Sequence, residues 1–171
     1  GLATGRFNER QVALVVELSP MLLNASEGVV TAILEEVSTR PVHSVLVQAI
    51  NVSGRQRMLS QRMAMEYFLI AGNVNADRYR VALQESIQNF DRALVGLIDG
   101  DPDQRLIAAP TTEIQIQLAN IRRLWTSQVS PLMFPVLNGV SPTTETVDEL
   151  ARLNLELLRE MNLAVEMYEM L

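Results

Sequence analysis

At 171 residues, with 48% apolar and 20% charged residues, the chain has the composition of one globular domain rather than of a disordered segment. It has no cysteine, which excludes disulfides and thiolate metal sites, and its net charge of −6 argues against a nucleic-acid partner. No run approaches the roughly 18 apolar residues of a membrane span, and the first ten residues lack the pattern of a signal peptide.

The amino-terminal part is predicted to be helical. One stretch runs from about Phe7 to Thr39, and the interior Pro20 should kink or break it. Residues 1–40 are therefore expected to form one or two helices that precede the rest of the domain. Pro41 suits the first position of a second helix, and Gly72 marks a normal helix end. We refer to this second stretch, 41–72, as the motif helix.

Three further helices are predicted, over residues 76–98, 111–130 and 143–171. Thr111 or Thr112 can cap the first turn of the helix at 111–130, because a threonine side chain accepts a hydrogen bond from a free backbone N–H. Pro131 and Pro135 are expected to break up the tail of that helix. No segment alternates with the period of two that is typical of a strand.

These helices and their short connectors predict an all-α protein, an antiparallel up-and-down four-helix bundle with an additional amino-terminal helix or a broken first helix. The last helix carries an apolar stripe with spacings of three and four, which is typical of a bundle core. Its members are Leu150, Leu153, Leu157, Met161, Ala164 and Tyr168. Tyr168 lies near the chain end, where we expect its hydroxyl to reach water.

The motif helix has an unusual distribution of side chains. At about 100° per residue they fall into a core stripe, a polar sector and a second apolar sector. The core stripe comprises Val45, Ala49, Val52, Leu59, Met63, Tyr67 and Ile70. The polar sector comprises Gln48, Asn51, Arg55, Arg62 and Glu66. The second apolar sector comprises Leu46, Ile50, Gly54, Arg57, Gln61, Ala64 and Phe68.

A helix with two apolar sectors needs two partners, its own bundle and, we expect, a second subunit. Gly54 would let two backbones approach closely, which offsets the roughly 1 kcal/mol that an interior glycine costs a helix. A twofold axis would set Arg57 opposite its own copy, and a small anion between the two guanidiniums would relieve their repulsion.

Two other interpretations remain open. Arginines on a helix are usually solvated, and this interpretation suits Arg55 and Arg62. The second apolar sector could also bind a protein partner without any small ligand, which would make the domain a helical interaction module.

The stretch from Asn51 to Arg62 resembles the motif of PilJ-type sensor domains, the amino-terminal domains of type IV pili methyl-accepting chemotaxis transducers. That motif reads N-x-x-G-R-Q-R-M-L-S-Q-R. The stretch is also similar to the shorter motif G-x-x-R-M-x-S-x-R of the Nar-type nitrate/nitrite sensor kinases. A looser resemblance continues through "FDRALVGLIDGD", "LWTSQV" and "LLREMNLAVEMYE", and so covers most of the chain after Pro41.

The resemblance implies a periplasmic sensor domain of a membrane-anchored receptor. Such a domain binds nitrate, or nitrite more weakly, at a homodimer interface and passes a helix displacement to a signalling module. The residue that matches the anion-contacting arginine is Arg57. The surroundings of the anion are expected to involve Gly54, Asn51, Arg55, Ser60, Gln61 and Arg62. Two departures from the pattern are the roughly 40 residues before the motif helix and Met65, where PilJ-type domains often carry lysine.

Enzyme and cofactor functions have little support in the sequence. The single histidine, His43, has no Glu-x-x-His pattern of a di-iron bundle, and no Cys-x-x-Cys-His haem attachment motif exists. The eight methionines are scattered over several helices and are better read as core residues than as copper ligands. Trp125 is most simply a core anchor. We therefore expect no enzyme activity, no metal and no cofactor.

Overall fold

The computed structural model describes residues 41–171, with side chains from Ser44 onward. Its helices are α2 (Pro41–Ala71), α3 (Ala76–Asp99), α4 (Thr112–Leu124), a π-helical turn (Trp125–Val129), α5 (Ser130–Leu137) and α6 (Thr144–Glu169). The predicted helix of residues 7–39, with its break at Pro20, lies outside the described residues. Within the described residues, the only β-type pairing is an isolated antiparallel bridge between Asp101 and Leu106.

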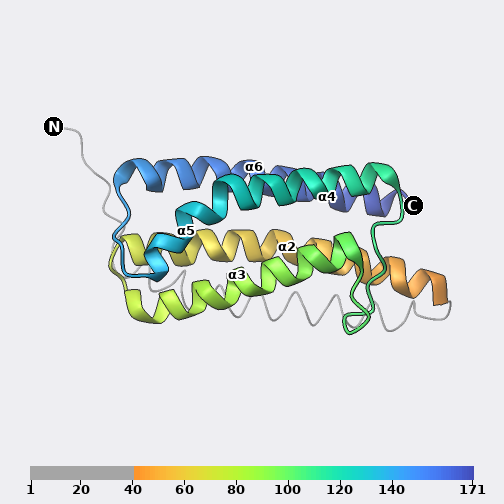
Figure 1. Ribbon diagram of the computed structural model, residues 1–171, viewed down its shortest axis with the longest axis horizontal. Coiled ribbons are helices and arrows are strands. Elements are labelled where there is room, and N and C mark those ends of the chain that lie inside the picture. Colours follow the sequence, from red (N-terminus) through yellow and green to blue (C-terminus); the bar gives the residue numbers. More distant parts are fainter. Residues whose placement is uncertain (1–40) are drawn as a thin grey trace. The chain divides into compact units, whose positions relative to one another are not determined.

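The described chain is an all-α, antiparallel up-and-down four-helix bundle, in which α4, the π-helical turn and α5 together form one of the four helices (Figure 1). Long-range hydrogen bonds join the helices in pairs. The side-chain amide of Gln56 on α2 donates to the carbonyl oxygen of Phe90 on α3 at 2.8 Å. The amide of Gln117 on α4 donates to the carbonyl oxygen of Glu160 on α6 at 2.9 Å. The all-α bundle predicted from the helical periodicity is thereby confirmed.

The helix ends follow local chemistry. α2 ends before Gly72, and the next turn uses Asn73 and Asn75 with positive φ angles of 55° and 46°, a conformation that asparagine tolerates better than most residues. Thr111 and Thr143 cap α4 and α6, since their hydroxyls accept from the backbone N–H groups of Ile114 and Thr146. These polar residues set where each helix begins.

The tail of the fourth predicted helix differs from the expectation. Pro131 and Pro135 do not break it up: α5 continues to Leu137 with Pro135 inside it. The chain accommodates the prolines through the preceding π-helical turn, in which the N–H of Ser130 donates to the carbonyl oxygen of Trp125, five residues back. Pro131 then falls in the first turn of α5, where its missing N–H matters little.

The core lies where the apolar stripes meet. The six predicted stripe residues of α6 are all buried, and so are those of α2 except Val45, which is partly exposed. The expectation for the Tyr168 hydroxyl was wrong. The side chain is 1% exposed, its hydroxyl has no partner among the described residues, and burial raises its pKa to about 12. The α6 stripe therefore stays inside the bundle through its last turn.

Candidate anion-binding site on the motif helix

The three arginines of α2 point to different sides of the helix. At about 100° per residue, Arg55 and Arg62 lie roughly 160° and 140° around the axis from Arg57. Nε of Arg62 donates to Oε1 of Glu66, one turn further along, at 2.8 Å. Arg55 is exposed. The arginines therefore do not form one basic cluster within the domain.

Arg57 differs from the other described arginines in its surroundings. Three of them are only partly exposed: Arg57, Arg62 and Arg80. Arg62 and Arg80 each pair with a carboxylate, Glu66 and Asp77 respectively. Arg57 makes no ion pair with any described residue. Its Nη1 instead donates to Oδ1 of Asn162, a neutral side chain on α6, at 3.1 Å. A partly buried guanidinium with an unneutralised charge favours an anion.

Gly54 lies directly beside that guanidinium. A Cβ atom added at Gly54 would stand 4.0 Å from Nη2 of Arg57, and it would meet no other atom within that distance. The glycine therefore leaves space one turn before Arg57 on the same side of α2. We had expected this space to admit a neighbouring helix backbone. In the described chain it is bordered by the Arg57 side chain.

The remaining expected site residues differ in burial and in their position around α2. Ser60 is buried, and its hydroxyl donates to the carbonyl oxygen of Arg57 within the same helix at 2.8 Å. Asn51 is partly exposed and Gln61 is exposed. Of these three, Gln61 lies nearest to Arg57 in helical position, about 40° around the axis. The structure thus brings together Arg57 and Gly54, with Gln61 at the edge.

Gln56, next to Arg57, belongs to the interior. It is fully buried, and its hydrogen bond to the Phe90 carbonyl attaches the motif helix to α3. The ring of Phe90 packs against Trp125 of the π-helical turn, with ring centroids 4.6 Å apart. The residue before the candidate ligand-binding arginine is therefore part of the core packing.

Glu66 is the only carboxylate on α2, and it is buried, at 1% exposure. Burial raises its pKa above the ordinary value, and the hydrogen bond and charge of Arg62 counteract this only in part. The second carboxylate oxygen, Oε2, has no hydrogen-bond partner in the described part of the chain. Glu66, which the helical wheel assigned to the polar sector, is thus buried against the rest of the bundle rather than exposed.

The sequence interpretation missed Asn162 as a contact of Arg57. The two residues are 105 positions apart, and nothing in the spacing of α6 marks this asparagine except that it follows Met161 of the core stripe. Asp91 was also missed. It accepts the indole N–H of Trp125 at 2.5 Å, and burial raises its pKa against the opposing effect of that bond.

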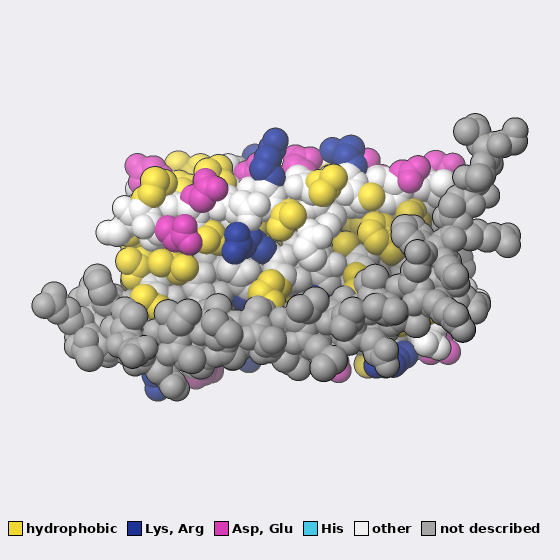
Figure 2. All heavy atoms as spheres, turned by 180° about the vertical axis from the view of Figure 1, so that it is seen from behind, with side chains coloured by type: hydrophobic (Ala, Val, Ile, Leu, Met, Phe, Trp, Pro, Cys, Tyr) yellow, Lys and Arg dark blue, Asp and Glu magenta, His cyan; other side chains and the backbone are white. Residues whose placement is uncertain are grey.

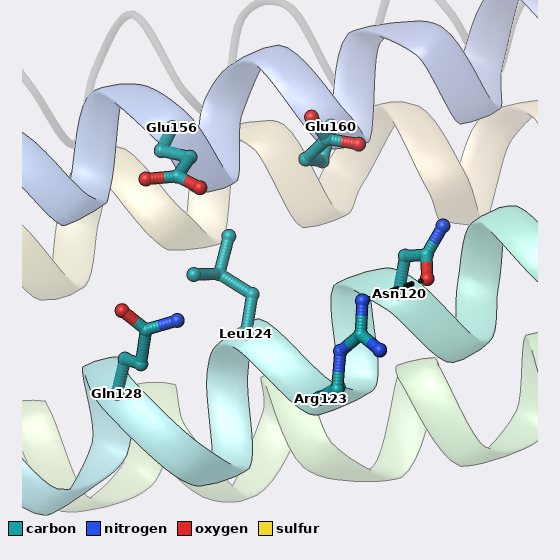
Figure 3. Close-up of a pocket in the computed structure, with 6 residues that line it drawn as sticks. All are labelled: Asn120, Arg123, Leu124, Gln128, Glu156 and Glu160. Atoms are coloured by element: carbon teal, nitrogen blue, oxygen red, sulfur yellow. Dashed lines mark hydrogen bonds between the residues drawn. The ribbon is translucent and has the colours of Figure 1, made fainter.

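A groove of about 260 Å³ lies between α6 and the helix formed by α4 and the π-helical turn (Figure 3). Glu156 and Glu160 line one side, and Asn120, Arg123, Leu124 and Gln128 line the other. Both carboxylates already pair with arginines, Arg152 and Arg159 respectively. Two carboxylates repel anions, so this groove does not suit an anionic ligand.

The described surface gives little support to other classes of site. The face seen in Figure 2 mixes acidic, basic and apolar side chains, without a broad basic area on its described part. Residues 44–171 contain no group of acidic or histidine side chains placed to hold a metal ion. None of the helices from α2 to α6 is long and apolar enough to cross a membrane.

A known protein family matches most of the bundle. Residues 46–154 match the family model "Type IV pili methyl-accepting chemotaxis transducer N-term", PilJ. The chain belongs to the PilJ family. This family comprises sensor domains of chemotaxis transducers rather than a class of enzymes. The match begins within the motif helix and ends inside α6, so the PilJ motif and its bundle are matched together.

A solved structure is similar to this PilJ domain. It is the ligand-binding domain of the P. aeruginosa nitrate receptor McpN, with 26% sequence identity and a TM-score of 0.61. The similarity covers 70% of this chain and 92% of that chain. No curated protein sequence matches the chain. The likeness in both fold and sequence supports a receptor ligand-binding domain.

Proposed function

We propose that this PilJ domain is an extracytoplasmic sensor that binds nitrate, or a similar small anion such as nitrite, through Arg57. The observation that carries the proposal is the state of the Arg57 side chain: it is partly buried, and among the described residues its guanidinium donates only to a neutral amide, that of Asn162. Nitrate is small, planar and singly charged, and the planar guanidinium can donate two parallel hydrogen bonds to it. The similarity to a nitrate receptor domain points to the same ligand.

The proposed site is shared by two copies of the domain. Arg57 lies on the second apolar sector of α2, where Phe68 is 37% exposed about 20° around the axis. If this sector pairs with its copy across a twofold axis, the two Arg57 guanidiniums approach each other. At an effective dielectric near 20 and a separation of roughly 7 Å they repel by about 2 kcal/mol, which one bound anion would offset.

Other residues of the motif then take graded roles. Gly54 keeps the space beside the guanidinium open, and Gln61 borders it. Asn51, Arg55, Ser60 and Arg62 would act on the surroundings rather than on the anion itself, because their positions on α2 turn away or are buried. Anion binding would draw the two motif helices together and shift them against the rest of each bundle. That displacement would reach the signalling module of a membrane-anchored receptor.

Calorimetric titration with nitrate tests the proposal, with Arg57→Ala and Arg57→Lys as variants. A charged hydrogen bond contributes about 1.5–3 kcal/mol, so removing both guanidiniums of a twofold site should abolish measurable binding. Lysine should fail as well, because a point charge cannot present the planar fork. Arg123→Ala is the matched control, since Arg123 also donates to a neutral asparagine, Asn120, but on the exposed surface.

Sedimentation with and without nitrate tests the shared site, because an anion held between two chains should strengthen the dimer. Nitrate binding by Arg57→Ala at the parent's affinity would overturn the proposed residue. A parent protein that binds none of the small anions would instead favour the interaction module, whose second apolar sector binds a protein without a ligand.

A further inference from the structure

A side chain from another helix accepts a hydrogen bond from the Arg57 guanidinium. Nη1 of Arg57 on α2 donates to Oδ1 of Asn162 on α6 at 3.1 Å. Arginine has donors and no acceptor, so the Asn162 amide must present its oxygen to the guanidinium. A long arginine side chain otherwise samples many rotamers, and a hydrogen bond to a packed helix selects a few of them.

Gly54 defines the other border of the same guanidinium. The position of a Cβ at Gly54 would be 4.0 Å from Nη2, so this nitrogen lies near bare helix backbone. Nη1 is thus fixed by Asn162, and Nη2 is accommodated by the glycine. The other N–H groups of Arg57 donate to no residue in the described range, which leaves them for a ligand.

We infer that Asn162 is the positioning residue of the anion site, an inference that rests on the function proposed above. Asn162 fixes the plane of the guanidinium and leaves its charge unneutralised. An aspartate in the same place would fix the plane equally well, but it would cancel the charge that attracts the anion. The chain has 20 acidic residues, and yet none described pairs with Arg57. A neutral acceptor is what an anion site requires there.

Asn162 also makes α6 a part of the site. It lies beyond the residues 46–154 that match the PilJ family, so the motif does not include it. With the guanidinium plane fixed, the site can distinguish a planar anion from a spherical one of the same charge, because only the planar anion meets two parallel N–H groups. Loss of the fixed plane should therefore weaken nitrate binding more than chloride binding.

Two variants separate position from charge. Asn162→Ala removes the acceptor and keeps the free charge of Arg57, and Asn162→Asp keeps the acceptor and neutralises that charge. In calorimetry, Asn162→Ala should bind nitrate about tenfold more weakly, the effect of one lost hydrogen bond, and should show a lower ratio of nitrate to chloride affinity. Asn162→Asp should show no measurable nitrate binding.

Asn120 provides the matched control. Its Oδ1 accepts from Nη2 of Arg123 at 3.2 Å on the exposed surface of α4, so Asn120→Ala and Asn120→Asp make the same chemical changes elsewhere. Both control variants should bind nitrate like the parent. Thermal unfolding of all five proteins shows whether each variant is folded.

A second measurement tests the contact without any anion. Nitrogen-15 NMR of the arginine side chains should show slow rotation of the Arg57 guanidinium in the parent and faster rotation in Asn162→Ala. Equal rotation in both, or parent-like nitrate affinity and selectivity in Asn162→Ala, overturns the positioning role. A parent that binds no nitrate but has a restricted Arg57 overturns the proposed function instead.

Discussion

The indole N–H of Trp125 donates to Oδ1 of Asp91 at 2.5 Å, which ties the first residue of the π-helical turn to α3. The neighbouring Phe90 packs its ring on Trp125 and accepts the Gln56 amide with its backbone carbonyl. One layer of the bundle therefore joins the motif helix, α3 and the π-helical turn. Gln56 of this layer is adjacent to Arg57 in sequence, so the layer attaches the candidate site to the core.

Trp125→Phe should destabilise the domain, because it removes the only hydrogen bond of the buried indole and leaves the partly buried Asp91 carboxylate without that donor. The free energy of unfolding should fall by about 1.5–3 kcal/mol, the usual contribution of a hydrogen bond to a charged group. Chemical denaturation followed by circular dichroism measures this loss. Asp91→Asn, which keeps an acceptor oxygen, should cost less, and equal midpoints for Trp125→Phe and the parent would contradict the prediction.

Glu66 should make the stability of the domain decrease as pH rises above the ordinary carboxyl value of 4.5. Because its pKa is raised in the folded state, the folded protein binds more protons than the unfolded chain between 4.5 and the folded pKa, and the free energy of unfolding falls across that range. Glu66→Gln should remove this contribution and flatten the dependence there. The measurement is denaturant unfolding of both proteins at a series of pH values.

The difference between parent and variant isolates Glu66 from carboxylates that act in the opposite sense. Asp101 and Glu149, for example, have lowered pKa values because of hydrogen bonds from Gln104 and Arg152, so their contributions are lost as pH falls. Parallel pH profiles of the parent and Glu66→Gln above pH 4.5 would contradict this prediction. They would mean that Arg62 keeps Glu66 ionised in the folded state without lowering the free energy of unfolding.

Gly54→Ala separates the two roles of the glycine. Within one chain the new methyl group meets nothing closer than 4.0 Å, so the substitution should raise the free energy of unfolding by about 1 kcal/mol through helix propensity. If two motif helices approach closely at Gly54, the same methyl group should weaken the dimer. Denaturation and sedimentation of one variant test both expectations, and an unchanged dimer would show that the helices do not meet at this residue.

The helices were predictable from the sequence because their ends carry local signals: a capping threonine before α4, Gly72 after α2, and apolar stripes between them. The π-helical turn was not predicted, although the spacing of apolar residues in the sequence carries a signal for it. Buried residues recur at spacings of four through Ile121, Trp125, Val129 and Met133. In a regular α-helix three such steps would rotate the stripe by about 120°, and a π-helical turn takes in the additional residue.

Of the candidate site, only the arrangement within the motif helix could be predicted from the sequence. The helical wheel selected Arg57 and Gly54 because both lie on one side of one helix, and the structure places them together. Asn162 and the burial of Glu66 depend on which helices pack against α2 and in what register, and no spacing within a single helix contains that information. The partner of a side chain was the part that sequence reasoning could not supply.

The antiparallel order has a consequence for where motion at Arg57 can be sensed. Within residues 45–171, the first turns of α2 and the end of α6 lie at the same end of the bundle, the end of the loop that contains the Asp101–Leu106 bridge (Figure 1). At 1.5 Å per residue, Arg57 lies about 24 Å from the start of α2, and Asn162 about 10 Å from the end of α6. A rigid helix carries an axial slide along its whole length without loss. If α2 and α6 each move as a rigid body, an axial slide that alters the Arg57–Asn162 contact would produce an equal axial offset between these two helix ends.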